Sequence, residues 1–233
     1  MNQAGNINYQ QPIPLFPLAS CVLLPHATIR LHIFEPRYRA MVADALAGDQ
    51  LIAMATFNDP AWKSNYAENP IIHHAVCVGY ILRHNILPDG RYNILLQGIA
   101  RATIKSELEH NPYRIAMLQD LEQNNNTKPV MEIDLHDTRQ HLDTLIHDDT
   151  LSQLASVQAL RNGLCNDIPT PALVDLATLT ICQDSPSRYT ILAEPDPHAR
   201  ATWLLNHLTQ LKQTVTNALR SNTGDPDSGI YYN

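Results

Sequence analysis

The chain has 233 residues, of which 44% are hydrophobic and 17% charged, a composition that excludes a disordered chain and fits one large domain or two small ones. Its formal net charge of −7 is unevenly placed, because the first 125 residues hold 9 basic and 10 acidic side chains and the rest hold 7 and 13. This acidity argues against nucleic acid and against an anionic membrane surface as partners. No apolar run approaches the roughly 18 residues of a membrane helix, and residues 1–11 do not resemble a signal peptide, so we expect a cytoplasmic protein.

The first half of the sequence has the period of β-strands. Residues 12–18 contain three prolines, which oppose a helix and predict an extended segment at the edge of a sheet. Residues 28–34 alternate, with apolar side chains on one side and Arg30 and His32 on the other, as a half-buried strand does. Runs of β-forming residues predict four more strands, at residues 51–57, 75–84, 91–105 and 113–118.

Turn residues and one helix divide this series of strands. Residues 87–90 (Leu-Pro-Asp-Gly) predict the tight turn of a hairpin, since proline pre-sets the first turn dihedral and glycine tolerates a positive φ. Gly98, inside the returning strand, predicts a bulge or a bend. After the second strand, a helix is expected to begin at Pro36 and to end at Gly48. So many strands joined by tight turns favour a compact barrel or pseudo-barrel with one inserted helix.

The second half of the sequence has the helical period. The polar residues 123–128 are the predicted linker, and helices are expected at residues 133–147 and 151–164 and in three later segments. The longest, residues 197–220, carries one apolar stripe. Each helix start after the first has a candidate cap residue, namely Thr150 with Gln153, Thr170 before Pro171, Ser185 before Pro186, and Asp196 before Pro197.

These patterns predict an α+β protein in two parts. We expect a β-rich subdomain over residues 1–122 and a helical bundle over residues 129–221, packed on the barrel. Residues 222–233 are expected to form a flexible tail, because they are polar and terminal.

No residue pattern in the chain predicts catalysis. The sequence has neither a G-x-S-x-G motif nor a reactive-cysteine signature. His136, His141 and His147 are five and six residues apart, whereas residues three or four apart share a helix face, so we expect solvated side chains and not a metal site. We therefore expect no cofactor, no metal ion and no catalytic residue. The cysteines fit no zinc or redox spacing and are expected to be buried free thiols, at Cys21, Cys77, Cys165 and Cys182.

An aromatic loop is one candidate protein-binding site. Phe57, Trp62 and Tyr66 lie amid polar residues between two predicted strands. Loops lie on surfaces, and aromatic side chains there are common anchors for a partner. The alternative is that the three rings fold back and close one end of the barrel.

The start of the inserted helix is a second candidate. Glu35, Arg37 and Tyr38 follow a strand and open the helix. Glu35 is placed to satisfy the free amides of the first turn, so these residues cap and pack the helix. The functional alternative is that they form a contact surface for another protein.

Six segments, in this order, resemble the substrate-binding domain of the ATP-dependent Lon proteases, a domain that also occurs in stand-alone proteins and in cereblon. They are IPLFPL from residue 13, VLLP from 22, LHIFEPRY from 31, VGYILR from 78, PDG with ILLQGIAR from 88, and EPDP from 194. The resemblance implies a PUA-like β-domain followed by a helical bundle. It also implies a non-catalytic module that binds extended or partly unfolded polypeptide, or another protein, through an apolar groove.

The differences from that family are equally informative. Lon proteases continue into an AAA+ ATPase and a Ser-Lys peptidase, whereas this sequence has no G-x-x-x-x-G-K-[ST] motif, and none of its four lysines lies in a similar peptidase site. Two alternatives stay open. One is an RNA-binding protein, because PUA-like folds often contact RNA, and the other is a small-molecule enzyme, for which no residue constellation can be named.

Overall fold

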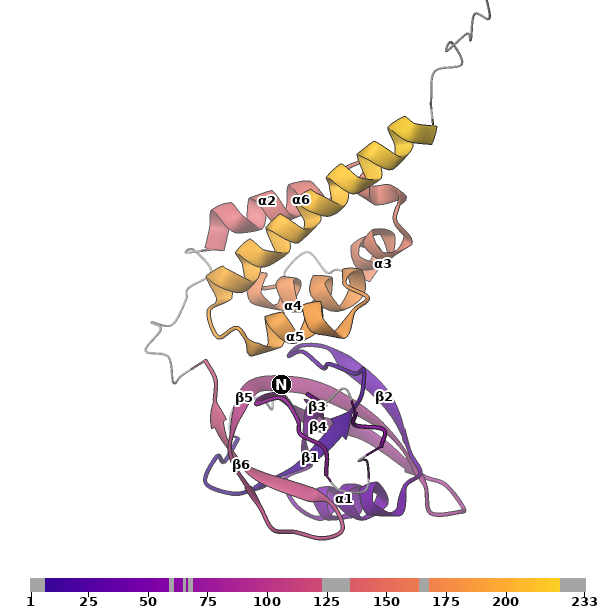
Figure 1. Ribbon diagram of the computed structural model, residues 1–233, viewed down its shortest axis with the longest axis vertical. Helices are drawn as coiled ribbons and strands as arrows, with labels where there is room; N and C mark the ends of the chain where they lie inside the picture. The colour runs from indigo at the N-terminus through magenta and orange to yellow at the C-terminus, as the bar shows by residue number, and fades with distance from the viewer. Residues whose placement is uncertain are drawn as a thin grey trace, which may run out of the picture.

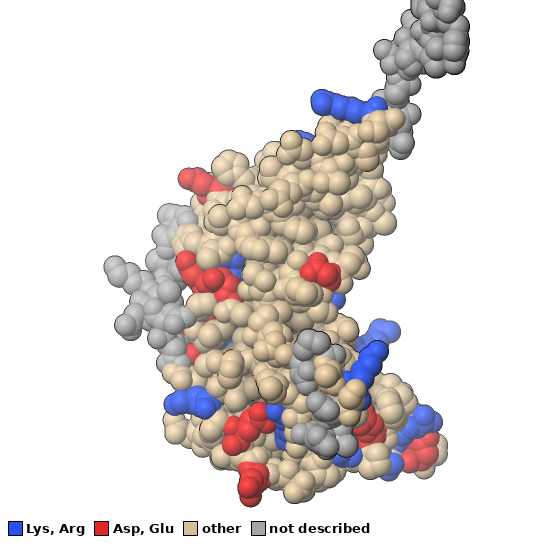
Figure 2. Space-filling model, in the orientation of Figure 1, with Lys and Arg blue, Asp and Glu red and all other residues tan. Residues whose placement is uncertain are grey.

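The computed structural model describes residues 7–58, 61–64, 66, 69–122, 135–163 and 168–222. Within them the chain forms a β half, which comes first in the sequence, and a helical half stacked on it along the long axis of the molecule (Figure 1). The described residues contain one mixed sheet of six strands and six α-helices. On the visible face, charged side chains are denser over the β half than over the helical half (Figure 2).

The sheet has the order β2-β5-β4-β3-β1-β6, and β6 also pairs with β5. The ladder that starts at β5 therefore passes through β4, β3, β1 and β6 and returns to β5, with β2 added beside β5. Only the β1–β3 pair is parallel. The strands are β1 (Ile13–Leu18), β2 (Thr28–Ile33), β3 (Leu51–Thr56), β4 (Ala75–Ile86), β5 (Tyr92–Leu108) and β6 (Arg114–Asp120).

The prediction that residues 12–18 form an edge strand is wrong. Strand β1 lies inside the sheet, between β3 and β6, but it pairs with them along different stretches that share only Leu15. Pro14 adjoins β6 alone and Pro17 adjoins β3 alone. Each missing N–H therefore weakens one ladder and not two, which is how an interior strand tolerates its prolines.

Both predictions for the β4–β5 hairpin are confirmed. Gly90 has a φ of +78°, and its N–H donates to the carbonyl of Leu87 at 2.8 Å, which closes the turn. The pairing register shifts between Val78 and Gly79, at the point where Gly79 lies opposite Gly98. This shift is the predicted bulge, and it bends the long β5 strand so that it pairs with β2 and β6 in turn.

The inserted helix α1 (Pro36–Ala47) also has its predicted bounds. Gly48 follows it, and the Gly48 N–H donates to the carbonyl of Asp44 at 3.1 Å. One face of the helix enters an apolar cluster that contains side chains of β2, β3, β4 and β5. Its buried residues are Tyr38, Met41, Val42 and Ala45. Burial of this face fixes the start of α1 against the sheet, and the candidate binding residues lie there.

The helical half consists of five α-helices around a second apolar cluster. Residues 151–164 do not form the single helix that periodicity predicts. A 3-10 turn (Leu151–Gln153) ends at Leu154, whose ψ of 126° is extended, and a new helix follows. The helices are α2 (His136–Ile146), α3 (Ala155–Gly163), α4 (Thr170–Ile181), α5 (Ser185–Ala193) and α6 (Pro197–Asn222).

Aspartates cap three of the helical segments. Asp148 accepts the N–H groups of Thr150 and Leu151, so the predicted Thr150–Gln153 capping box is wrong. Asp184, one residue before the predicted Ser185, accepts the Ser187 N–H at 2.7 Å. The predicted cap Asp196 is confirmed by its bond to the His198 N–H at 2.9 Å, whereas Thr170 is the buried first residue of α4 and Pro169 stands at the N-cap position.

The two halves share both apolar and ionic contacts. Ile191 and Leu192 of α5 belong to the cluster that fills the β half. Beside them, Arg101 of β5 forms a buried ion pair with Asp175 of α4. Arg200 of α6 and Arg101 both contact Glu122, at 3.0 Å and 3.4 Å. The junction therefore holds charges inside the protein as well as apolar side chains.

The predicted free thiols are found where the structure describes them. Cys77 and Cys182 are buried and Cys21 is half-buried, each unbridged. Burial raises the pKa of the Cys182 thiol to about 11 and raises the pKa of Cys77 further. Both thiols are thus protonated and inert near neutral pH. Cys165 lies outside the described residues.

Candidate functional site

The two candidate segments come together on one side of the β half. The loop after β3 brings Phe57, Trp62 and Tyr66 onto the start of α1, where Glu35 and Arg37 lie. The sequence predicts these as two separate sites. The structure makes them one cluster, which we call the aromatic cluster: Glu35, Arg37, Tyr38, Phe57, Trp62 and Tyr66.

Three rings form the loop side of the cluster. Phe57 and Trp62 stack with centroids 5.1 Å apart and planes inclined by 9°. Tyr66 meets both of them edge-on, at 6.2 Å from Phe57 and 6.1 Å from Trp62. These are the offset and edge-to-face arrangements that aromatic pairs prefer. All three residues are half-buried, so each keeps part of its surface for solvent or for a partner.

Glu35 joins the loop to the helix. The Tyr66 hydroxyl donates to Glu35 Oε1 at 2.7 Å, and Arg37 Nε donates to Glu35 Oε2 at 3.1 Å. Glu35 stands at the N-cap position of α1 with an extended backbone, but its side chain makes no capping bond. The predicted cap is therefore wrong for the side chain, because the carboxylate is turned outward and is engaged by Tyr66 and Arg37.

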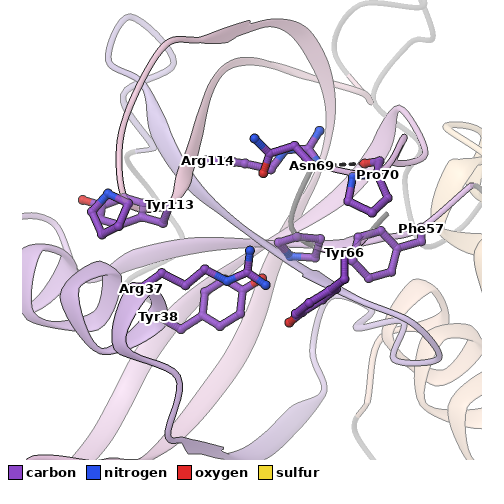
Figure 3. Close-up of a pocket in the computed structure, with 10 residues that line it drawn as sticks. Arg37, Tyr38, Phe57, Tyr66, Asn69, Pro70, Tyr113 and Arg114 are labelled. Atoms are coloured by element: carbon purple, nitrogen blue, oxygen red, sulfur yellow. Dashed lines mark hydrogen bonds between the residues drawn. The ribbon is translucent and has the colours of Figure 1, made fainter. Parts of the chain in front are cut away.

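Arg37 lies between two tyrosine rings. Its guanidinium carbon is 4.6 Å from the centroid of Tyr38 and 4.4 Å from that of Tyr66 (Figure 3). Burial alone lowers the pKa of the Arg37 guanidinium, but Tyr38, Tyr66 and Glu35 outweigh burial and raise it. Arg37 therefore remains charged and is held in one orientation.

Tyr38 belongs to the core and not to the exposed surface. It is 3% exposed, and its ring packs against Phe16 with centroids 4.6 Å apart. Burial, and then the hydrogen bond with Tyr66, raise the pKa of its hydroxyl. Of the six predicted residues, Tyr38 alone is buried, and the guanidinium of Arg37 lies over its ring.

Two residues that the sequence does not single out complete the site. Tyr113 and Arg114, at the start of β6, line a shallow recess together with Arg37, Phe57 and Tyr66 (Figure 3). Both are fixed by bonds to other segments: the Tyr113 hydroxyl donates to Asp44 at 2.6 Å, and Arg114 donates to the Pro70 carbonyl at 2.8 Å. Nothing in their local sequence distinguishes them, because their position depends on sheet pairing between distant strands.

Replacing Tyr66 by phenylalanine is expected to lower the free energy of unfolding by about 1 kcal/mol. The change removes the bond to the Glu35 carboxylate and keeps the ring, and a half-exposed bond to a charged group contributes at the lower end of the usual range. Urea unfolding measures the loss. Tyr92→Phe is the matched control, because among the described residues the Tyr92 hydroxyl has no hydrogen bond, and no change is expected there. Equal stability of Tyr66→Phe and wild type would contradict the bond.

The side chains of the site are suited to non-covalent contacts. Ring faces bind apolar side chains, and a fixed guanidinium donates hydrogen bonds to carbonyl or carboxylate oxygens. The rings and guanidinium groups come from the loop after β3, the start of α1 and the start of β6, so the surface depends on the folded sheet.

Comparison with known proteins identifies the family of the chain. The family model of the ATP-dependent protease La (LON) substrate-binding domain matches residues 12–210. The chain belongs to this family.

Curated relatives of this LON domain are much longer proteins. The Lon protease of Trichlorobacter lovleyi is 32% identical over 109 residues, which make up 47% of this chain and 13% of that protein. The Lon protease of Cytophaga hutchinsonii is 24% identical over 200 residues, or 83% of this chain and 23% of that protein. The LON domain described here thus spans less than a quarter of either relative.

Solved structures support the fold of the LON domain. The N-terminal domain of the Lon protease from the Mycobacterium avium complex superposes with a TM-score of 0.61 at 13% identity, over 86% of this chain and 98% of that one. A Lon N-terminal domain protein from Xanthomonas campestris gives 0.56 at 20% identity, over 84% and 98%. None of the helices in the described residues combines the length and hydrophobicity needed to span a membrane.

Proposed function

We propose that this chain is a recognition module that binds extended or partly unfolded polypeptide, or another protein, and that it catalyses no reaction. The observation that carries the proposal is the convergence of two sequence-predicted segments into the aromatic cluster, in a chain that belongs to a substrate-binding family. The half-exposed rings of Phe57 and Trp62 would take apolar side chains of the bound segment. Arg37, fixed between two tyrosines, would donate hydrogen bonds to the carbonyl groups of the bound segment.

Several finer assignments belong to the same proposal. We infer a PUA-like pseudo-barrel over residues 1–122, supported by the ladder that returns to β5, and a helical bundle over residues 129–221, supported by its shared apolar cluster. The predicted tail, residues 222–233, lies outside the described residues except for Asn222, the last residue of α6, and the predicted linker, residues 123–128, lies outside them entirely. Buried free thiols support a cytoplasmic location.

RNA binding is the less favoured alternative. The formal net charge of −7 opposes a polyanion over most of the surface. The rings of the aromatic cluster are engaged with one another and with Arg37, whereas single-stranded RNA needs free aromatic platforms along a basic groove.

Replacing Trp62 by serine is expected to weaken capture of unfolded polypeptide about tenfold or more, with little change in melting temperature. A half-buried aromatic anchor contributes strongly to binding, whereas its removal from a surface loop exposes little core. Fluorescence anisotropy with reduced, iodoacetamide-blocked lactalbumin measures the dissociation constant. Leu219→Ser is the matched control, because Leu219 is an apolar residue of α6, 39% exposed, far from the cluster.

Two results would contradict the proposed function. Unchanged capture by Trp62→Ser would remove the aromatic cluster from the binding surface. Hydrolysis of ATP or cleavage of casein by the purified chain, with contaminants excluded, would overturn the non-catalytic role.

A further inference from the structure

A second surface, with a lining different from that of the recess, lies on the exposed face of β2, β5 and β4. Arg30 of β2 and Arg83 of β4 both pair with Leu95 of β5, so the three residues form one row across the sheet. Paired residues of antiparallel strands point to the same face, and neighbouring strands are about 4.8 Å apart. The two arginines therefore stand on one face, on either side of Leu95, with backbones about 10 Å apart.

The two arginines are exposed and uncompensated. Among the described residues, neither Arg30 nor Arg83 has a salt bridge, whereas eight ion pairs form elsewhere in the structure. Residues 28–34 and 80–97, which build this face, contain three arginines and one aspartate. That aspartate, Asp89, is already bound to Arg91 at 2.6 Å.

Polar side chains form the next row of residues on the same face of the sheet. His32 Nδ1 lies 2.7 Å from Asn93 Oδ1, and Arg91 Nη1 lies 3.3 Å from His32 Nε2. His32 and Asn93, together with the arginine row, line an open depression of about 590 Å³. Leu95 contributes an apolar patch to its floor, and Asn85 a further amide. The depression thus offers positive charge at two edges, hydrogen-bonding groups, and an apolar centre.

We propose that this depression binds an acidic segment of extended polypeptide, with carboxylate side chains placed on Arg30 and Arg83. Charge complementarity carries the inference: a locally positive face is retained on a protein whose net charge is −7. Arginine binds carboxylates with two parallel hydrogen bonds, and an apolar residue between the acidic ones would lie on Leu95. The inference rests on the proposed function and adds to it a preference for acidic segments.

A nucleic acid fits this face less well. Two free arginines at opposite edges make a clamp and not the continuous basic track that a phosphate backbone follows. The residue between them is a leucine, which suits the apolar side chain of a peptide. No lysine occurs in either segment that builds the face.

The test compares short fluorescein-labelled peptides of one composition, in which aspartate is kept, replaced by asparagine, or replaced by lysine. Wild-type protein is expected to bind the aspartate peptide most tightly, and added salt should weaken that binding. The double variant Arg30→Gln/Arg83→Gln should bind the aspartate peptide about tenfold more weakly or worse. Arg161→Gln/Arg220→Gln makes the same charge change on exposed positions of α3 and α6 and should leave binding unchanged.

The outcomes separate this inference from the proposed function. Equal binding of the aspartate and asparagine peptides, or an unchanged affinity in Arg30→Gln/Arg83→Gln, overturns the acidic site while leaving lactalbumin capture by the aromatic cluster intact. If the wild-type protein does not bind unfolded lactalbumin, the proposed function itself is wrong. The last measurement uses a labelled single-stranded RNA. If the wild-type protein binds this RNA more tightly than the aspartate peptide, and Arg30→Gln/Arg83→Gln binds the RNA more weakly than wild type does, the ligand is nucleic acid. The peptide proposal is then wrong. A melting curve of each variant confirms that it is folded.

Discussion

Replacing Asp175 by alanine is expected to lower the free energy of unfolding by about 3–5 kcal/mol, because it leaves buried positive charge without its partner. Asp175 is fully buried in α4, and its carboxylate accepts from Arg101 of β5, which is 3% exposed. Arg200 is 1% exposed and close by. Burial and the nearby positive charge of Arg101 lower the pKa of the Arg200 guanidinium. Glu122, at the surface, would still contact both guanidinium groups.

Urea unfolding at neutral pH measures this loss, and the two tryptophans add a second readout. Trp62 lies in the β half and Trp203 in the helical half, so single-tryptophan variants follow each half separately. Asp175 and Arg101 join the halves, and we expect the two transitions to coincide in wild type and to separate in Asp175→Ala. Asp143→Ala is the control, since its pair with Arg139 is a surface i,i+4 contact that contributes about 0.5 kcal/mol or less. A loss below about 1 kcal/mol for Asp175→Ala would show that the buried pair is not stabilising.

The sequence predicts most elements of the fold because local patterns determine them. Strand β2 alternates as predicted, because Ile33 is buried and Ile29 and Leu31 are half-buried, whereas Arg30 and His32 are exposed. The β4–β5 turn follows from proline and glycine chemistry. By contrast, the place of β1 inside the sheet depends on pairing with β3 and β6, which lie far away in the sequence. Likewise, the break at Leu154 has no local signal, because leucine is a good helix former and only packing makes it extended.

The candidate site was half predictable for the same reason. Aromatic residues in a polar loop are a local signal, and so is a charged helix start. That Tyr66 bonds Glu35, 31 positions earlier, is a tertiary fact which neither segment contains. The buried Asp175 carried a usable signal, since it is the one charged residue of the apolar helix α4. Its partner Arg101 gave none, because an arginine in a long strand is ordinarily exposed.

Gly98→Ala is expected to lower the free energy of unfolding by about 3 kcal/mol. A Cβ at this position would lie 2.2 Å from the carbonyl oxygen of Leu24 and 2.9 Å from the sulfur of Cys77. The first contact is with backbone, so no side-chain rotation relieves it. The same backbone is tied to Gly98 on both sides, since Gly98 donates to Ala27 and accepts from His26, each at 2.9 Å. Moving the loop away would break these bonds at the entry to β2.

The matched control for Gly98→Ala is Gly163→Ala, which is expected to change the free energy of unfolding in the opposite direction. Gly163 ends α3, and nothing lies within 4 Å of a Cβ built there. Gly163→Ala gains helix propensity and is expected to raise the free energy of unfolding by up to about 1 kcal/mol. Thermal and urea unfolding of the two variants, each compared with wild type, measure both effects. If Gly98→Ala were as stable as wild type, the close packing of the loop before β2 against the β5 bulge would be wrong. The position of β2, and of Arg30 in the arginine row, would then be wrong as well.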